Sequence, residues 1–139
     1  MATEENKKSA RRLVIHGINS GNMAVIDEHI SPNVVPHTLP LGFPPTREGL
    51  KSFITGFRAA FPDLHYGIED ELVDGDKVVH RLKGAGTMKG DFQGMRASGK
   101  KATWHEMHIG RFDANGRIVE HWGIMDIMSM MTQLGFGPK

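Results

Sequence analysis

The segment KKATWHEMHIGRFDANGRIVEHWGIMD, residues 100–126, is typical of a long β-hairpin. Two runs rich in Trp, Ile, Val and Met flank the sequence DANG at 113–116, which is typical of a tight turn. A two-residue or a four-residue loop there gives the same register, in which Phe112 faces Arg117 and Met107 faces Trp122. This register predicts which side chains of the two strands share a face of the sheet.

Side chains alternate between the two faces of a strand, so the register sorts the hairpin into two sets. The first set is mainly Met, Ile and Trp with a few polar groups, and we expect it to line an enclosed pocket: Thr103, His105, Met107, Ile109, Ile118, Glu120, Trp122, Ile124 and Asp126. The second set would form the opposite face, which is apolar enough that we expect it to be covered in a homodimer: Trp104, Glu106, His108, His121 and Met125. A β-bulge at Gly110 or Gly123 would reverse the facing of every residue beyond it.

Asp126 is a carboxylate within the apolar run GRIVEHWGIMDIMSMMTQLG, residues 116–135. Burying an unpaired charge costs several kcal/mol, so such a group is expected to be paired or to be neutralised. In the predicted register His105 lies diagonally from Asp126, at about 7–8 Å, which long side chains can bridge. Asp126 is therefore a candidate catalytic acid or base, with His105 as its partner. The alternative is that Asp126 caps a C-terminal helix.

The rest of the chain predicts an α+β fold of one domain, residues 1–139, with helices first and an antiparallel sheet second. Apolar spacing and capping residues predict helices over 4–20, 22–30, 47–61 and 127–134, with Thr46 as an N-cap and Gly135 as a stop. Residues 64–87 read as two strands around the turn DGD. The Pro-rich segment 31–46 is predicted to be an ordered loop.

Charge and composition exclude several classes of function. Seventeen Lys and Arg balance sixteen Asp and Glu, which gives no electrostatic reason to expect a nucleic-acid partner. The absence of cysteine excludes disulfides, thiolate nucleophiles and Cys-type zinc sites. The N-terminus lacks the apolar stretch of a secretory signal, and no apolar run reaches about 18 residues, so we expect a cytoplasmic protein without a membrane partner.

The histidines of the hairpin do not form a metal motif. The sequence HEMH at 105–108 differs from HExxH, and on a strand His105 and His108 would point to opposite faces. We therefore expect no metal. His108 and His121 can form a cross-strand pair, with two surface or interface histidines as the alternative. His80 and Arg81 occupy successive strand positions, so only one of them can face a pocket.

Four further residues are candidates for binding a substrate. His37 lies in the Pro-rich loop, the kind of segment that forms the rim of a site, although a loop histidine that bonds backbone is an equal alternative. Trp122 and Met107 belong to the face expected to line the pocket, and Met side chains adapt to varied apolar ligands. Glu120 shares that face as a cavity acid, with a solvent-facing strand residue as the alternative.

Three stretches carry a resemblance to a known family: FPDLHYGIEDELVDGDKVVHRLKGAGTMKGDFQG (61–94), GRIVEHWGIMD (116–126) and TQLG (132–135). In this order they resemble the SnoaL-like polyketide cyclases, also called ester cyclases, within the superfamily of nuclear transport factor two, ketosteroid isomerase and scytalone dehydratase. The resemblance implies a cone-shaped curved antiparallel sheet, wrapped by helices, around one apolar cavity. It spans nearly the whole chain. The family often has His after the Gly-Thr pair, where this chain has Met88.

The resemblance also implies a chemistry. Cyclases of this family close a ring by an intramolecular aldol reaction without a metal or cofactor, and their essential acid/base falls on Asp126. The assisting cavity histidine corresponds to His105 or to His108. The expected partner is an apolar small molecule, in a homodimer or higher homo-oligomer. Isomerase, dehydratase or hydrolase chemistry on the same fold, or a binding module without chemistry, are the alternatives.

Overall fold

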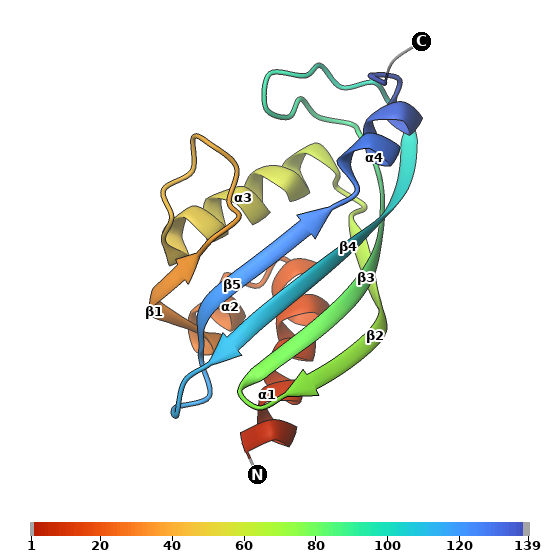
Figure 1. Ribbon diagram of the computed structural model, residues 1–139. Helices are drawn as coiled ribbons and strands as arrows, with labels where there is room; N and C mark the ends of the chain where they lie inside the picture. The colour runs from red at the N-terminus through yellow and green to blue at the C-terminus, as the bar shows by residue number, and fades with distance from the viewer. Residues whose placement is uncertain (1, 138–139) are drawn as a thin grey trace.

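The structure, a computed structural model, describes residues 2–137 and has the α+β architecture that the sequence predicts (Figure 1). Its helices are α1 (Ala2–Arg12), the π-helical η1 (Leu13–Ile18), α2 (Met23–His29), α3 (Arg47–Ala60) and α4 (Ile127–Leu134). Its strands are β1 (Ile30–Pro36), β2 (His65–Asp74), β3 (Lys77–Thr87), β4 (Lys101–Phe112) and β5 (Ile118–Met125). The strands form one curved sheet in the order β1-β5-β4-β3-β2, and α1 to α3 lie behind it in Figure 1. None of the described helices is both long and apolar enough to cross a membrane.

Capping residues and apolar spacing in the sequence account for the position of helix α3. The Thr46 hydroxyl accepts a hydrogen bond from the Gly49 N–H at 3.1 Å and caps α3. The buried Leu50 and Phe57 then recur at helical spacing along its inner face. The predicted first helix is continuous in the structure but changes to π-helical hydrogen bonding after Arg12.

The Pro-rich segment is a strand over its first part, so the prediction of a loop from residue 31 is wrong there. Strand β1 runs parallel to β5, with Ile30 beside Ile118 and Pro36 beside His121. Among residues 2–137 no strand lies beyond β1, and such an edge position tolerates proline because the N–H that proline lacks is not needed to pair with a neighbour. The sheet is therefore mixed rather than purely antiparallel, and residues 37–46 lead from its edge to α3.

The β4–β5 hairpin is displaced by two residues from the predicted register. The Asp113 N–H bonds the Arg117 carbonyl at 2.8 Å, and a β-bulge then changes the pairing between Arg111 and Phe112. Beyond the bulge Met107 faces Ile124 and Ile109 faces Trp122. Because the displacement is an even number of residues, the predicted division of side chains between the two faces is retained from Glu120 to Met125. Ile118, on the other side of the bulge, is the exception and points into the core.

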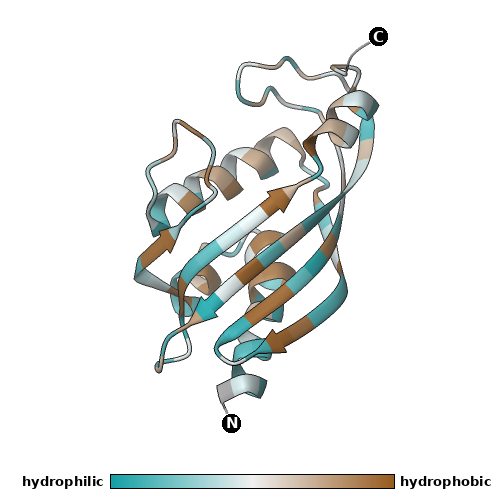
Figure 2. Ribbon diagram, in the orientation of Figure 1, coloured by the Kyte–Doolittle hydropathy of each residue, from teal (hydrophilic) through white to brown (hydrophobic). Residues whose placement is uncertain are grey.

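The choice of the inner face, however, is wrong. Trp104 is 2% exposed and packs in the core, whereas Met107 is 53% and Ile124 75% exposed on the outer face. Figure 2 shows both hydrophobic and hydrophilic residues along β3 and β4, and the exposed Met107 and Ile124 give the outer face apolar positions as well. Two clusters of buried side chains fill the space between sheet and helices, one around Phe57 and Trp104 and the other around Ile26 and Phe112.

Candidate functional site

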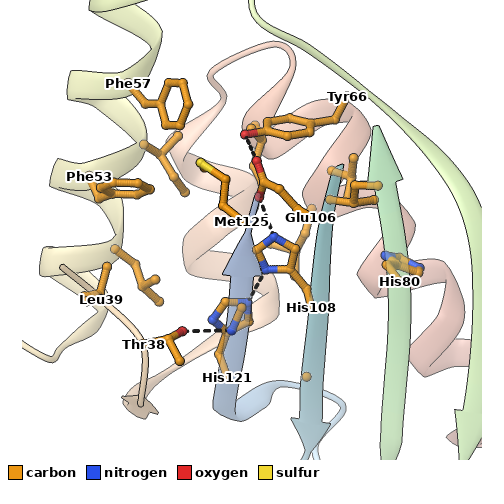
Figure 3. Close-up of a pocket in the computed structure, with 18 of the residues that line it drawn as sticks. Thr38, Leu39, Phe53, Phe57, Tyr66, His80, Glu106, His108, His121 and Met125 are labelled. Carbon is orange, nitrogen blue, oxygen red and sulfur yellow. Dashed lines mark hydrogen bonds and ion pairs between the residues drawn. The ribbon is translucent and has the colours of Figure 1, made fainter. Parts of the chain in front are cut away.

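A cavity of about 320 Å³ lies between the inner face of the sheet and the helices. Both core clusters contribute to its wall, which is mostly aliphatic and aromatic. A few polar side chains interrupt this wall, and Figure 3 shows most of them on neighbouring strands: Thr38, Tyr66, His80, Glu106, His108 and His121. An apolar cavity with a few convergent polar groups is the usual form of a small-molecule site.

Four of these groups form a continuous hydrogen-bonded chain across the wall (Figure 3). The Tyr66 hydroxyl donates to Glu106 Oε2 at 2.5 Å, and Trp104 Nε1 donates to the same oxygen at 2.7 Å. Glu106 Oε1 lies 2.7 Å from His108 Nε2. His108 Nδ1 in turn lies 2.9 Å from His121 Nε2. A buried carboxylate is thus linked through one imidazole to a second.

The surroundings set the protonation of this chain. Burial, reinforced by the neighbouring Glu106 carboxylate, raises the pKa of Tyr66 well above its usual value, so its hydroxyl stays a donor. Burial, with the charges of His108 and His37, lowers the pKa of His121 to about 3, so this ring is neutral at pH 7. The bonding pattern is satisfied when His108 donates from Nε2 to Glu106 and His121 donates from Nε2 to His108.

A glycine makes room for the two imidazoles. Gly123 pairs with His108 across β4 and β5, and a Cβ at this position would lie 2.5 Å from His108 Nδ1. The Gly123 N–H donates to Thr38 Oγ1 at 2.8 Å, which ties the loop after β1 to β5 beside His121. Any larger residue at position 123 would therefore displace the ring of His108.

None of the six residues predicted to form the site is among those that line the cavity. His105 and Met107 are exposed on the outer face of β4. His37, Glu120 and Trp122 do come together, but on the outer face: the His37 ring stacks on Trp122 with centroids 4.8 Å apart and bonds Glu120 at 2.8 Å. The predicted pocket of His105, Trp122 and Asp126 is therefore wrong.

Asp126 follows β5 and begins α4. Its Oδ1 accepts a hydrogen bond from the Ser129 N–H at 3.2 Å, and its own N–H donates to the His105 carbonyl at 2.9 Å. This is the helix-capping arrangement that the sequence left as the alternative to catalysis. Its acid/base role stays a prediction, to be tested directly against the histidines of the cavity.

The sequence predicted part of this chain, since His108 and His121 were a possible cross-strand pair and His108 a candidate cavity histidine; Glu106 and Tyr66 were missed. Glu106 and His108 are two apart on one strand, and His121 belongs to the same predicted face. A carboxylate and two imidazoles on one face of a hairpin indicate a hydrogen-bonded polar network. This signal is as clear as the one by which the single Asp126 was chosen as a candidate catalytic residue. Tyr66 has no comparable signal, because only the packing of β2 against β3 and β4 brings it to Glu106.

Over residues 2–137, no group of three or more His, Asp or Glu side chains is arranged to hold a metal ion. Glu106, His108 and His121 bond one another in sequence, so their facing atoms are already used in hydrogen bonds. The arrangement is suited to moving protons along a line.

Comparison with known proteins agrees with this fold. The family model described as SnoaL-like polyketide cyclase matches residues 8–134. No curated protein matches the chain. A proposed polyketide cyclase from Bacillus cereus is 33% identical, with 96% of this chain and 83% of that chain covered and a TM-score of 0.83. IdmH from Streptomyces antibioticus, also a proposed polyketide cyclase, is 30% identical over 94% and 98% of the chains, with a TM-score of 0.81.

A third solved structure extends the range of activities. AclR from Streptomyces galilaeus, described as a proposed hydroxylase, is 26% identical, with 99% of this chain and 89% of that chain covered and a TM-score of 0.85. The cone-shaped fold is therefore shared by proteins to which different reactions are ascribed. The match to the family model over most of the sequence, together with the fold, shows that the chain belongs to the SnoaL-like polyketide cyclase family.

Proposed function

We propose that this protein is a cofactor-independent acid/base enzyme of the cyclase type, which closes a ring in an apolar carbonyl compound by an intramolecular aldol reaction. The observation that carries the proposal is the chain from Glu106 through His108 to His121, set in an otherwise apolar cavity. The general base is then the imidazole pair, in place of the pair of Asp126 and His105 that the sequence predicted.

The two imidazoles act as a relay. Across residues 2–137, no group bonds Nδ1 of His121, so this nitrogen is free to take a proton from the carbon beside a carbonyl. As it does so, Nε2 of His121 passes its proton to His108 Nδ1. The positive charge then rests on His108, where the Glu106 carboxylate stabilises it, and not on His121, whose surroundings oppose a charge.

The remaining steps return the proton. The enolate carbon attacks the second carbonyl of the same molecule, forming the new carbon–carbon bond and an alkoxide. The relay then runs in reverse and protonates that alkoxide, so that no atom or electron is gained or lost. The apolar wall excludes water, which strengthens these interactions. The same relay would serve isomerisation, dehydration or hydrolysis on this fold, and the product distinguishes these.

Exchange of the α-protons of 1-tetralone, an apolar bicyclic ketone, for deuterium in D₂O tests the relay without knowledge of the substrate. His121→Gln and His108→Gln should each lower the exchange rate by about 10²–10⁴, the usual contribution of a positioned acid or base. His105→Gln and Asp126→Asn serve as matched controls and should change it less than about threefold. Loss of exchange in Asp126→Asn, with full exchange in both cavity variants, would assign the chemistry to Asp126 instead.

We further propose that the protein forms a homodimer through the outer face of the sheet. Met107 and Ile124 are exposed there, and α1 to α3 all lie on the opposite side (Figure 1). Exposed apolar side chains that lie next to one another mark a surface for protein contacts. The sequence predicted a dimer through the face that bears Trp104, but that face is buried in the core.

A further inference from the structure

A row of paired residues, three of them with titratable side chains, crosses the sheet at the level of His108. Glu71 on β2 pairs with His80 on β3, His80 pairs with His108 on β4, and His108 pairs with Gly123 on β5. Residues that face one another across neighbouring strands have Cβ atoms about 4.5–5.5 Å apart. His80 and His108 therefore lie side by side, and both line the cavity. The relay uses only His108.

His80 has its own carboxylate and its own counter-charge. Its Nε2 lies 2.8 Å from Glu71 Oε2. Glu71 also accepts a two-nitrogen contact from the Arg11 guanidinium, with Arg11 Nε 3.0 Å from Oε2. The Arg11 and His80 contacts outweigh the effect of burial and lower the pKa of Glu71, so that it is ionised at pH 7. An ionised carboxylate only accepts, so the hydrogen on His80 is at Nε2.

The other nitrogen of His80 is an unused acceptor. Burial lowers the pKa of His80, and the charges of His108 and Arg11 act in the same direction, so the ring stays neutral despite Glu71. With the hydrogen at Nε2, Nδ1 carries a lone pair, and none of the described residues bonds it. In the described part of the chain, Arg47 Nε is the one fully buried side-chain nitrogen or oxygen that has no hydrogen-bond partner. Nδ1 of His80 also has no such partner, so it is not fully buried and borders open space. His80 lines the cavity, which supplies that space.

We propose that His80 Nδ1 accepts a hydrogen bond from a hydroxyl group of the substrate, so that the cavity selects apolar carbonyl compounds bearing a phenol or enol hydroxyl. This inference rests on the proposed function for the carbonyl half of the substrate. Glu71 and Arg11 are positioning residues, because they act by fixing the tautomer of His80. Within the row, the His108 relay handles the acidic carbon and His80 recognises the neighbouring oxygen.

The test is a comparison of two ligands in binding, without turnover. 2-Naphthol and 2-methoxynaphthalene share the same rings, but only the first can donate a hydrogen bond. Isothermal titration calorimetry at pH 7.5 should show the wild-type protein binding 2-naphthol about three- to tenfold more tightly, the usual effect of one hydrogen bond. His80→Phe should reduce this ratio to about one.

A second pair of variants keeps the inference testable if His80→Phe does not fold. Glu71→Gln replaces a carboxylate, which can only accept, with an amide that can also donate a hydrogen bond to His80 Nε2. The hydrogen of His80 can then move to Nδ1, so the preference for 2-naphthol over 2-methoxynaphthalene should decrease. Asp70→Asn is the matched control, since Asp70 is the neighbouring acid and bonds the exposed Arg81 at 2.6 Å. Its ratio should equal that of the wild type.

A wild-type ratio of one, or an unchanged ratio in His80→Phe and Glu71→Gln, would overturn the inference. Deuterium exchange into 1-tetralone that persists alongside such a result would leave the proposed function standing. A hydroxyl preference that depends on His80, without any exchange, would support the role of His80 and contradict the relay instead.

Discussion

At the scale of single residues, the buried neutral His121 couples stability to acidity. Its pKa is about 3 in the folded protein and about 6.5 in the unfolded chain. Between these values the unfolded chain binds a proton that the folded protein excludes, so stability falls as the pH decreases from 6.5 towards 3. At pH 5 this loss amounts to about 2 kcal/mol for the one residue.

His121→Gln should remove that share of the acid sensitivity. Urea denaturation at pH 7 and pH 5 measures it, and the fall in the free energy of unfolding should be smaller in the variant than in the wild type by about 2 kcal/mol. His80 and His29, whose pKa values burial also lowers, account for part of the remaining fall. His105→Gln, on the outer face, is the control. An equal fall in wild type and His121→Gln would show that His121 is protonated in the folded state.

Gly123 gives a second prediction at this scale. In Gly123→Ala the new Cβ would overlap His108 Nδ1, so the ring must move and the bond to His121 is lost. We expect the free energy of unfolding to fall by about 1–3 kcal/mol, as for other overpacked sites, together with at least a tenfold loss of α-proton exchange. Gly67→Ala is the control, because a Cβ at this strand position has open space. An active, stable Gly123→Ala protein would contradict the role given to His108.

At the scale of elements, Asp126 provides a test of α4. Asp126→Ala removes the acceptor for the Ser129 N–H and should lower the free energy of unfolding by about 1 kcal/mol, whereas Asp126→Asn keeps a cap and should change it little. Urea denaturation of the two variants measures the difference. Equal losses in both would mean that the negative charge of Asp126, and not its capping bond, stabilises the protein.

The hairpin shows how far sequence reasoning reaches. The alternation of side chains predicted that Trp104, Glu106, His108 and His121 share a face, and the structure confirms it because turn and bulge together displace the register by an even number. The choice between the faces failed for a physical reason. The face with Trp122, Met107 and Ile124 is the more apolar, yet Glu106 is buried because Tyr66, Trp104 and His108 satisfy its oxygens.

Asp126 and the Pro-rich segment show the same limit. Burial of a carboxylate was inferred from apolar neighbours along the chain, but Asp126 lies where the strand ends, where it is exposed and caps α4. Strand β1 was missed because its pairing with β5 is parallel and distant in sequence. Local patterns predict elements and faces; contacts between distant elements decide which face is enclosed.

At the scale of the whole molecule, charged residues introduced into the proposed interface should separate the dimer into monomers. Introducing Met107→Glu and Ile124→Glu together places like charges on an apolar patch that a second copy would cover. Light scattering at micromolar concentration should give a dimer mass for the wild type and a monomer mass for the double variant. Ile15→Glu, at an exposed apolar position of η1 on the helix side of the molecule, is the control and should remain a dimer. A monomeric wild-type protein would contradict the proposal.

The cavity between the two core clusters has a further consequence, for the response to hydrostatic pressure. Unfolding eliminates internal space, and the decrease in volume scales with the space lost. A chain of this length that keeps a largely apolar cavity of about 320 Å³ should therefore unfold at lower pressure than a protein of equal stability with a filled core. A ligand that occupies the cavity would remove most of this sensitivity, so the shift in the pressure midpoint reports how completely a compound fills the site.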